Sequence, residues 1–152
     1  MRRLVIVRHA KAEPNAETDF LRPLSRRGHQ QARECAKWIR KLPFEIDVAL
    51  VSSALRTAQT WEELNLGCPV NLLDDAYNAS AETLVHLIRE FAGTSQTVLI
   101  VGHNPGISDL AFANGYPTEL STCASVLIEL TTDWNQFGLI EGSPAATFNP
   151  DH

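Results

Sequence analysis

The chain has 152 residues, of which 44% are hydrophobic and 20% charged, and its formal net charge is −5. This composition excludes a disordered or fibrous protein and predicts one globular domain over residues 1–152. The acidic balance and the lack of a basic patch argue against nucleic acid as a partner, so any affinity for phosphate has to come from a local cluster of positive groups.

The cysteines and the amino terminus point to a cytoplasmic protein. Cys35, Cys68 and Cys123 are odd in number and widely spaced, which suits neither a disulfide framework nor a zinc site, so we expect reduced thiols. The apolar stretch after Met1 is too short for a signal peptide or a membrane span. We therefore expect no membrane partner.

Strands and helices are expected to alternate through the first two thirds of the chain. The apolar run Leu4–Val7 predicts a buried strand, and Ser25 is placed to cap a helix from Arg26 to about Lys41. The later elements, in order, are a strand over 47–51, a helix capped by Ser52 and Ser53 that ends near 66–67, a short strand over 70–73, a helix that begins at Ser80 and ends before Gly93, a strand over 97–101, and a helix with Pro105 in its first turn.

The last third of the chain has a different pattern. Residues 124–130 and roughly 145–148 are expected as strands, without a full helix between them. The chain as a whole therefore predicts a three-layer α/β/α sandwich with a mostly parallel central sheet and an antiparallel edge strand.

Two histidines follow directly after predicted buried strands. Arg8 and His9 come after the first strand, and His103 comes after the strand over 97–101. The carboxyl ends of parallel strands meet at the edge of the sheet where α/β folds bind ligands. A histidine fixed there can present one neutral ring nitrogen as a nucleophile toward phosphorus, and an arginine beside it can donate to two phosphoryl oxygens.

A second arginine and a second helix start add to this cluster. Arg56 lies near the start of a predicted helix, and a protonated His103 before Asn104 would face the same anion. Like charges about 4 Å apart repel by roughly 4 kcal/mol at an effective dielectric constant near 20, so such a grouping is costly without an anionic ligand. The cost indicates a functional site for phosphate.

Four sequence blocks carry a family resemblance. They are Arg8-His9-Ala10-Lys11-Ala12, then Asp19 with Arg22-Pro23-Leu24-Ser25 and Gly28, then residues 52–60 (SSALRTAQT), then Val101-Gly102-His103-Asn104-Pro105-Gly106. In this order they resemble the histidine phosphatase superfamily, with its phosphoglycerate mutase-like fold, and more narrowly the short SixA-type phosphohistidine phosphatases. The resemblance covers about the first two thirds of the chain.

The resemblance implies a two-step phosphoryl transfer without metal or organic cofactor. His9 would attack phosphorus and become phosphohistidine, Arg8, Arg56 and His103 would hold the equatorial oxygens, and water would release inorganic phosphate. Arg22, Lys11 and Asn104 lie in matched blocks and would extend the phosphate site. Arg22 has an alternative role, which is to pair with Asp19 and order its loop.

The expected general acid of many superfamily members has no obvious counterpart. Glu82 is a candidate, although it could simply support the amino end of its helix, and Asp74 and Asp75 are weaker candidates. Members of the short subgroup also lack a clear acid, and the labile phosphorus–nitrogen bond of phosphohistidine needs less help to break than an ester. The segments between the second strand and the strand over 97–101 also leave no room for the large helical lid of longer relatives.

Three functions remain open on the sequence alone. The first is a phosphatase of protein phosphohistidine, acting on a phosphorelay or phosphotransfer component. The second is a general small-molecule phosphomonoesterase, which requires a working carboxylic acid. The third is a non-catalytic module that binds phosphorylated ligands, and the retention of His9 argues against it.

Overall fold

A computed structural model describes residues 1–138 and 142–151, and in this part of the chain a six-stranded sheet lies between helices. The strands are β1 (Arg2–Arg8), β2 (Val48–Ser52), β3 (Val70–Leu73), β4 (Thr97–Gly102), β5 (Ser125–Leu130) and β6 (Gly142–Phe148). The α-helices are α1 (Arg26–Arg40), α2 (Leu55–Leu64), α3 (Ala81–Phe91) and α4 (Gly106–Ala113), and the short 3₁₀ helices are η1 (Asp19–Leu21), η2 (Asp74–Ala76) and η3 (Trp134–Gln136).

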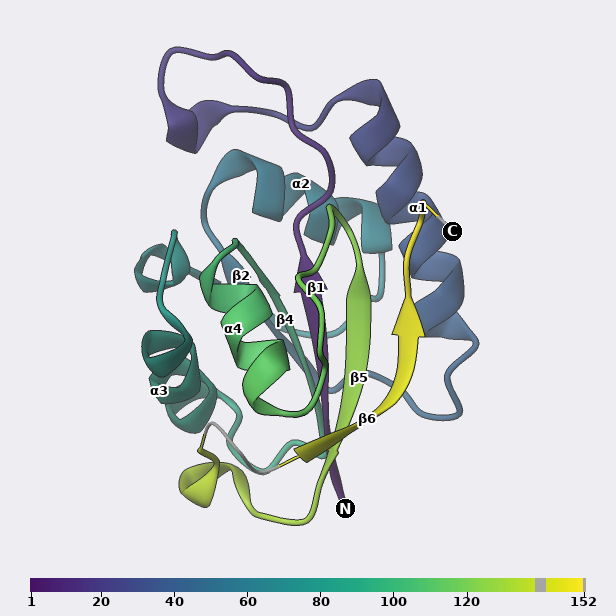
Figure 1. Ribbon diagram of the computed structural model, residues 1–152, viewed down its shortest axis with the longest axis vertical. Coiled ribbons are helices and arrows are strands. Elements are labelled where there is room, and N and C mark those ends of the chain that lie inside the picture. Colours follow the sequence, from purple (N-terminus) through teal and green to yellow (C-terminus); the bar gives the residue numbers. More distant parts are fainter. Residues whose placement is uncertain (139–141, 152) are drawn as a thin grey trace.

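The sheet has the order β3-β2-β4-β1-β5-β6, and its first four strands run parallel. Two helices cover each face (Figure 1). The sheet needs helices on both faces because alternate residues of its strands are apolar on both sides. In β1, Leu4 and Ile6 pack in the core under α3 and α4, whereas Val5 and Val7 pack under α1 and α2. The predicted three-layer sandwich is confirmed.

The carboxyl-terminal third completes one side of the sheet. β5 runs antiparallel to β1, and β6 runs antiparallel to β5, with a register shift between Leu127 and Ile128. Phe148 at the end of β6 stacks on Trp38 of α1, at 5.9 Å between ring centroids. The predicted antiparallel edge is therefore present and consists of two strands.

Two of the three predicted serine caps are confirmed. Ser25 Oγ accepts from Gly28 N–H at 3.0 Å, and Ser80 Oγ accepts from Thr83 N–H at 3.2 Å. The third prediction is wrong, because α2 begins after Ala54 without a side-chain cap and ends at Asn65, which adopts a left-handed conformation with φ 48°. Ser52 has another partner, described below. Among residues 1–138 and 142–151, no helix is long and apolar enough to cross a membrane.

Candidate phosphate site at the carboxyl edge of the sheet

The adjacent parallel strands β1 and β4 bring the two histidines together. Arg8 is paired with Gly102 in the register, and the next residue, His9, donates its backbone N–H to the Gly102 carbonyl at 3.0 Å. The rings of His9 and His103 lie with their centroids 5.4 Å apart. The sheet topology thus places both predicted histidines at one point.

His9 is buried, with only 7% of its surface exposed, and its tautomer is fixed. Its Nδ1 lies 2.7 Å from the Ala10 carbonyl oxygen, which can only accept a hydrogen bond. Nδ1 therefore carries the proton and Nε2 carries the lone pair. Burial, followed by the charges of Arg56, Arg8 and Arg22, lowers the His9 pKa to about 4, although the bond to Ala10 opposes this. The ring is neutral at physiological pH.

Two arginines flank this ring from different elements. Arg8 comes from the end of β1, and its Nη1–H donates to the Leu120 carbonyl at 3.1 Å. Arg56 comes from the first turn of α2 and is almost completely buried, at 3% exposed. Burial is the main cause that lowers the Arg8 pKa, and the nearby charge of Arg56 acts in the same direction.

One carboxylate, that of Asp19 in η1, binds two arginines. Arg56 Nη2 donates to Asp19 Oδ2 at 3.1 Å, while Arg22 Nε donates to Oδ1 at 3.0 Å. The Tyr77 hydroxyl also donates to Oδ2. This hydrogen bond, together with the arginines, lowers the Asp19 pKa to about 2, so the group is ionised.

His103 has a different environment from the one its sequence context predicts. Its Nε2 lies 2.8 Å from Ser52 Oγ, and the ring is 3% exposed. Burial, followed by repulsion from His9 and Arg56, lowers the His103 pKa to about 3. Burial and the neighbouring positive charges thus favour a neutral His103 ring in this structure, whereas its sequence context predicts a protonated ring that faces an anion.

Unsatisfied polar atoms concentrate in the same cluster. Nε of Arg8, Nε of Arg56 and Nδ1 of His103 are buried and have no hydrogen-bond partner within residues 1–138 and 142–151. Burying a donor without an acceptor costs about 1–3 kcal/mol. An arrangement of this kind suits a tetrahedral oxyanion, which offers several acceptors and negative charge to two guanidinium groups.

The other predicted phosphate ligands are placed less favourably. Arg22 follows its alternative role, because it pairs with Asp19 and also donates to the Glu13 carbonyl at 3.0 Å. The Asn104 side chain is occupied on both sides: its amide donates to Glu119 and to the Leu120 carbonyl, and its oxygen accepts from Ser108.

Lys11 and Glu82 contribute no side-chain contact to the cluster among the described residues. Lys11 is exposed, and its hydrogen bonds are made by its backbone: its N–H donates to Gln31 and its carbonyl accepts from Ser25. Glu82 is exposed in the first turn of α3. Asp74, another candidate acid, accepts from the Ser53 hydroxyl.

Sequence reasoning missed several residues that shape the site. The sequence pattern predicts a helix cap for Ser52 and, for Asp19, only a pairing with Arg22. It indicates no role for Tyr77, whose ring packs edge-on against His103 at 5.5 Å between centroids. Thr60 supports the backbone after His9 by accepting from Ala10 N–H at 3.0 Å. Ser52 and Thr60 lie inside the block 52–60, which was the available signal.

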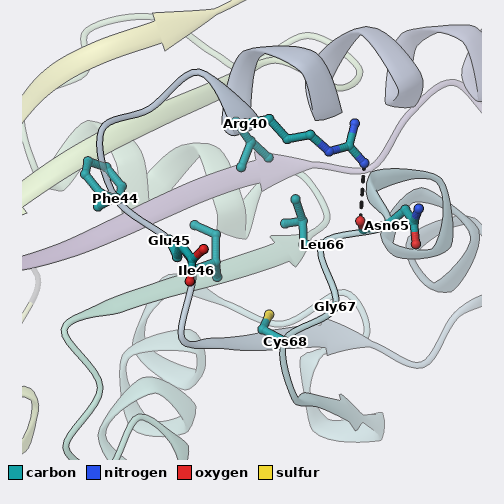
Figure 2. Close-up of a pocket in the computed structure, with 9 residues that line it drawn as sticks. Arg40, Phe44, Glu45, Ile46, Asn65, Leu66, Gly67 and Cys68 are labelled. Carbon is teal, nitrogen blue, oxygen red and sulfur yellow. Dashed lines mark hydrogen bonds between the residues drawn. The ribbon is translucent and has the colours of Figure 1, made fainter.

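A separate hollow of about 300 Å³ lies at the opposite edge of the sheet. Figure 2 shows its lining, which comes from the end of α1 and from the segments that lead into β2 and β3. Arg40 closes one side by donating to the carbonyls of Leu64 and Asn65, at 2.8 and 3.2 Å. None of the arginines and histidines of the cluster lines this hollow.

Comparison with known proteins agrees with this geometry. A sequence profile of the histidine phosphatase superfamily (branch 1) matches residues 4–82. The phosphohistidine phosphatase SixA of Escherichia coli is 34% identical over 107 residues, 66% of each chain. An uncharacterized protein of Mycobacterium tuberculosis (strain CDC 1551 / Oshkosh) is 34% identical over 106 residues, which are 69% of this chain and 67% of that protein.

Solved structures extend the likeness over nearly the whole chain. A protein histidine phosphatase SixA in complex with tungstate superposes with a TM-score of 0.84 at 25% identity, covering 98% of this chain and 97% of the other. A SixA from Agrobacterium tumefaciens, described as a putative phosphohistidine phosphatase, gives a TM-score of 0.76 at 29% identity, with coverages of 84% and 91%. The chain belongs to the histidine phosphatase superfamily, and it is of the SixA type within that superfamily.

Proposed function

We propose that this protein is a phosphatase that removes the phosphoryl group from a phosphohistidine side chain of another protein, through a covalent intermediate on His9. The observation that carries the proposal is the state of His9, a neutral ring whose Nδ1–H is held by the Ala10 carbonyl. That hydrogen bond leaves Nε2 with a lone pair beside Arg8 and Arg56. A nucleophile toward phosphorus requires this tautomer.

The proposed reaction has two steps at one phosphorus atom. In the first, Nε2 of His9 forms a bond to phosphorus while the bond from phosphorus to the substrate imidazole breaks. The substrate imidazole takes a proton from solvent on its other ring nitrogen before this step, so it leaves as the neutral base. In the second, water attacks the phosphohistidine of His9, which releases inorganic phosphate and restores the neutral ring. The side chains of Arg8, Arg56 and His103 hold the phosphoryl oxygens through both steps. The proposed steps use no metal ion.

The state of the nearby carboxyl groups supports a phosphoramidate substrate over an ester. Asp19 is held ionised by Tyr77, Arg56 and Arg22, so it has no proton to give. Glu82 is exposed on α3 and has no hydrogen bond or ion pair to the cluster among the described residues. An imidazole leaving group depends less on a general acid than an alkoxide does. The name of the E. coli relative, a phosphohistidine phosphatase, supports the same class, and a phosphorelay or phosphotransfer component is the proposed partner.

The test is a parallel rate assay without added metal. A phosphohistidine-bearing protein and a panel of small phosphate esters are offered to the wild type and to His9→Ala. We expect rapid loss of phosphohistidine, weak ester turnover, and a loss of at least about 10³-fold in the variant, in line with the removal of a nucleophile.

Inorganic phosphate binding serves as the control, since Arg8, Arg56 and His103 remain in the variant. We expect His9→Ala to bind phosphate within a few-fold of the wild type. Preferential turnover of one small ester would replace the proposal with a phosphomonoesterase. A lack of turnover with every substrate, with phosphate still bound, would leave a binding module.

A further inference from the structure

Ser52, the last residue of β2, has no exposed surface and contacts His103 directly. Its Oγ lies 2.8 Å from His103 Nε2 and accepts a longer hydrogen bond, 3.3 Å, from Ala54 N–H. Its carbonyl accepts from the Thr57 hydroxyl at 2.7 Å. The position of the serine is thus fixed by the turn that begins α2.

The contacts of Ser52 determine the direction of its hydrogen bond to His103. A serine hydroxyl has one hydrogen to donate. The oxygen can accept two hydrogen bonds, and Ala54 N–H uses one of these positions. Within the described residues, His103 Nε2 is the acceptor within reach of the hydroxyl hydrogen, and a bond in the opposite direction would leave that hydrogen without an acceptor. The serine therefore donates and Nε2 accepts. A neutral imidazole with a lone pair on Nε2 carries its proton on Nδ1.

We propose that Ser52 is a positioning residue that keeps the proton of His103 on Nδ1, from which the neutral ring donates a hydrogen bond to the phosphoryl group. Nδ1 is the ring atom that is buried without a partner among the described residues. The inference rests on the proposed phosphoryl transfer at His9, whose ring lies 5.4 Å away.

This arrangement solves an electrostatic problem in the cluster. The positive charges of Arg8 and Arg56 already act on the His103 ring, and an additional imidazolium would add repulsion in a buried place. The opposite tautomer would turn a lone pair toward an anion, which is also unfavourable. A neutral ring with Nδ1–H supplies a directional donor without another charge. The lowered pKa of His103 agrees with a neutral ring.

The first test reads the tautomer by long-range ¹H–¹⁵N correlation spectra of histidine-labelled protein at neutral pH, with and without inorganic phosphate. The His103 signals are assigned by their loss in His103→Asn. We expect protonated Nδ1 and unprotonated Nε2 in the wild type. In Ser52→Ala we expect the proton to be shared between the two nitrogens or moved to Nε2.

The matched control is Ser53→Ala, one residue further along. The Ser53 hydroxyl donates to Asp74 and does not contact His103. We expect this variant to keep the wild-type tautomer, phosphate affinity and turnover. Ser52→Ala should bind inorganic phosphate more weakly and lose about tenfold or more in kcat/KM, as expected for the loss of a group that orients a functional histidine. Ser52→Thr keeps the hydroxyl and should recover part of that loss.

Two results would overturn the inference. One is a wild-type His103 protonated on Nε2, a measurement that does not depend on how any variant folds. The other is a folded Ser52→Ala that keeps protonated Nδ1 and unchanged phosphate affinity. Both readouts use inorganic phosphate and need no turnover, so they are separate from a failure of the phosphohistidine assay.

Discussion

Asp19 binds the Arg56 guanidinium group through two of its three nitrogen atoms. Its Nη1 donates to the Asp19 carbonyl at 2.8 Å and its Nη2 to the Asp19 carboxylate, whereas Nε has no partner among the described residues. These two hydrogen bonds fix the plane of the guanidinium group. A planar group held in this way can present its remaining donors to an oxyanion in one orientation.

We expect Arg56→Lys to reduce kcat/KM by about 10²-fold or more, because an ammonium group keeps the charge and loses both the fork and the hold by Asp19. The measurement is steady-state kinetics with the substrate that the wild type prefers. Arg22→Lys is the matched control, since Arg22 is engaged by Asp19 and by the Glu13 carbonyl, and it should lose less than about tenfold. Equal losses in the two variants would remove the special role of Arg56.

At the residue scale, the sequence is informative about which side chains gather and less so about their protonation. Arg8, His9 and His103 follow apolar runs that predict parallel strands, so their place at one edge of the sheet is predictable, while the adjacency of β1 and β4 is known only from the structure. The neutral state of His103 is not, because it depends on burial at 3% exposure and on the distance to other cations. The prediction for Ser52 is wrong for a similar reason. A serine before a helix is usually a cap, and only the fold shows that the Ser52 hydroxyl contacts His103 instead.

At the scale of elements, the first turn of α1 packs closely against the backbone of the loop that follows β1. A methyl group added to Gly28 would lie 2.0 Å from the Lys11 carbonyl oxygen. That carbonyl also accepts from Ser25 N–H at 2.9 Å, so the helix start and the loop are fitted to one another. Glycine is required here by close approach of two backbones.

We expect Gly28→Ala to destabilise the protein by roughly 1–3 kcal/mol or more, because the backbone of the loop has to move to accommodate the methyl group. Urea unfolding followed by circular dichroism measures the change. Gln30→Ala, on an exposed position of the same helix, should change the free energy of unfolding by less than about 0.5 kcal/mol. A Gly28→Ala variant as stable as this control would contradict the prediction, because it would show that the loop backbone moves to accommodate the methyl group at no cost in stability.

Elements with strong apolar periodicity were predictable, and the contacts between loops were not. β1, β2, β4, β5, α1 and α3 lie close to the expected ranges, since burial on one or both sides dictates their patterns. β6 has no buried residue and begins at Gly142, earlier than the expected 145. By contrast, the contact of Tyr77 after η2 with Asp19 in η1 joins segments 58 positions apart. No local pattern predicts such a contact, because it forms only when the sheet has brought the two loops to the same edge.

At the scale of the whole molecule, the two buried histidines affect the stability of the fold. Both have a pKa lowered by burial, to about 4 for His9 and about 3 for His103, from an ordinary value of 6.5. At a pH below 6.5 and above these lowered pKa values, the two histidines bind protons in the unfolded chain and not in the folded chain. The contribution of these two histidines to stability is therefore complete above pH 6.5 and is lost progressively as the pH is lowered toward 4.

We expect the free energy of unfolding to fall by about 2 kcal/mol per pH unit near pH 5.5, since each group contributes up to about 1.4 kcal/mol per unit. Urea titrations between pH 7.5 and 4.5 measure the slope. His103→Asn removes one of the two groups and should reduce the slope by about half. A slope unchanged in this variant would contradict the lowered pKa of His103.

The carboxyl-terminal third, for which the sequence predicts two strands and leaves the role at the site open, makes hydrogen bonds to Arg8 and His9. Arg8 N–H donates to the Ala124 carbonyl at 3.2 Å, and Cys123 N–H donates to the His9 carbonyl at 3.0 Å. Leu120 receives a hydrogen bond from Arg8 as well. The segment before β5 makes these contacts with backbone atoms of Leu120, Cys123 and Ala124, so the side chains of these residues carry no signature of them in the sequence.

The backbone of His9 is thus bonded on both sides, to Gly102 through its N–H and to Cys123 through its carbonyl. An amide held within the central sheet exchanges its hydrogen with solvent only when the sheet itself opens, at a free energy near that of global unfolding. The loop that carries Asp19 belongs to none of the six strands, so we expect its amides to exchange through smaller, local openings. For the proposed protein substrate, we therefore expect conformational adjustment in that loop, while the proposed nucleophile keeps its place.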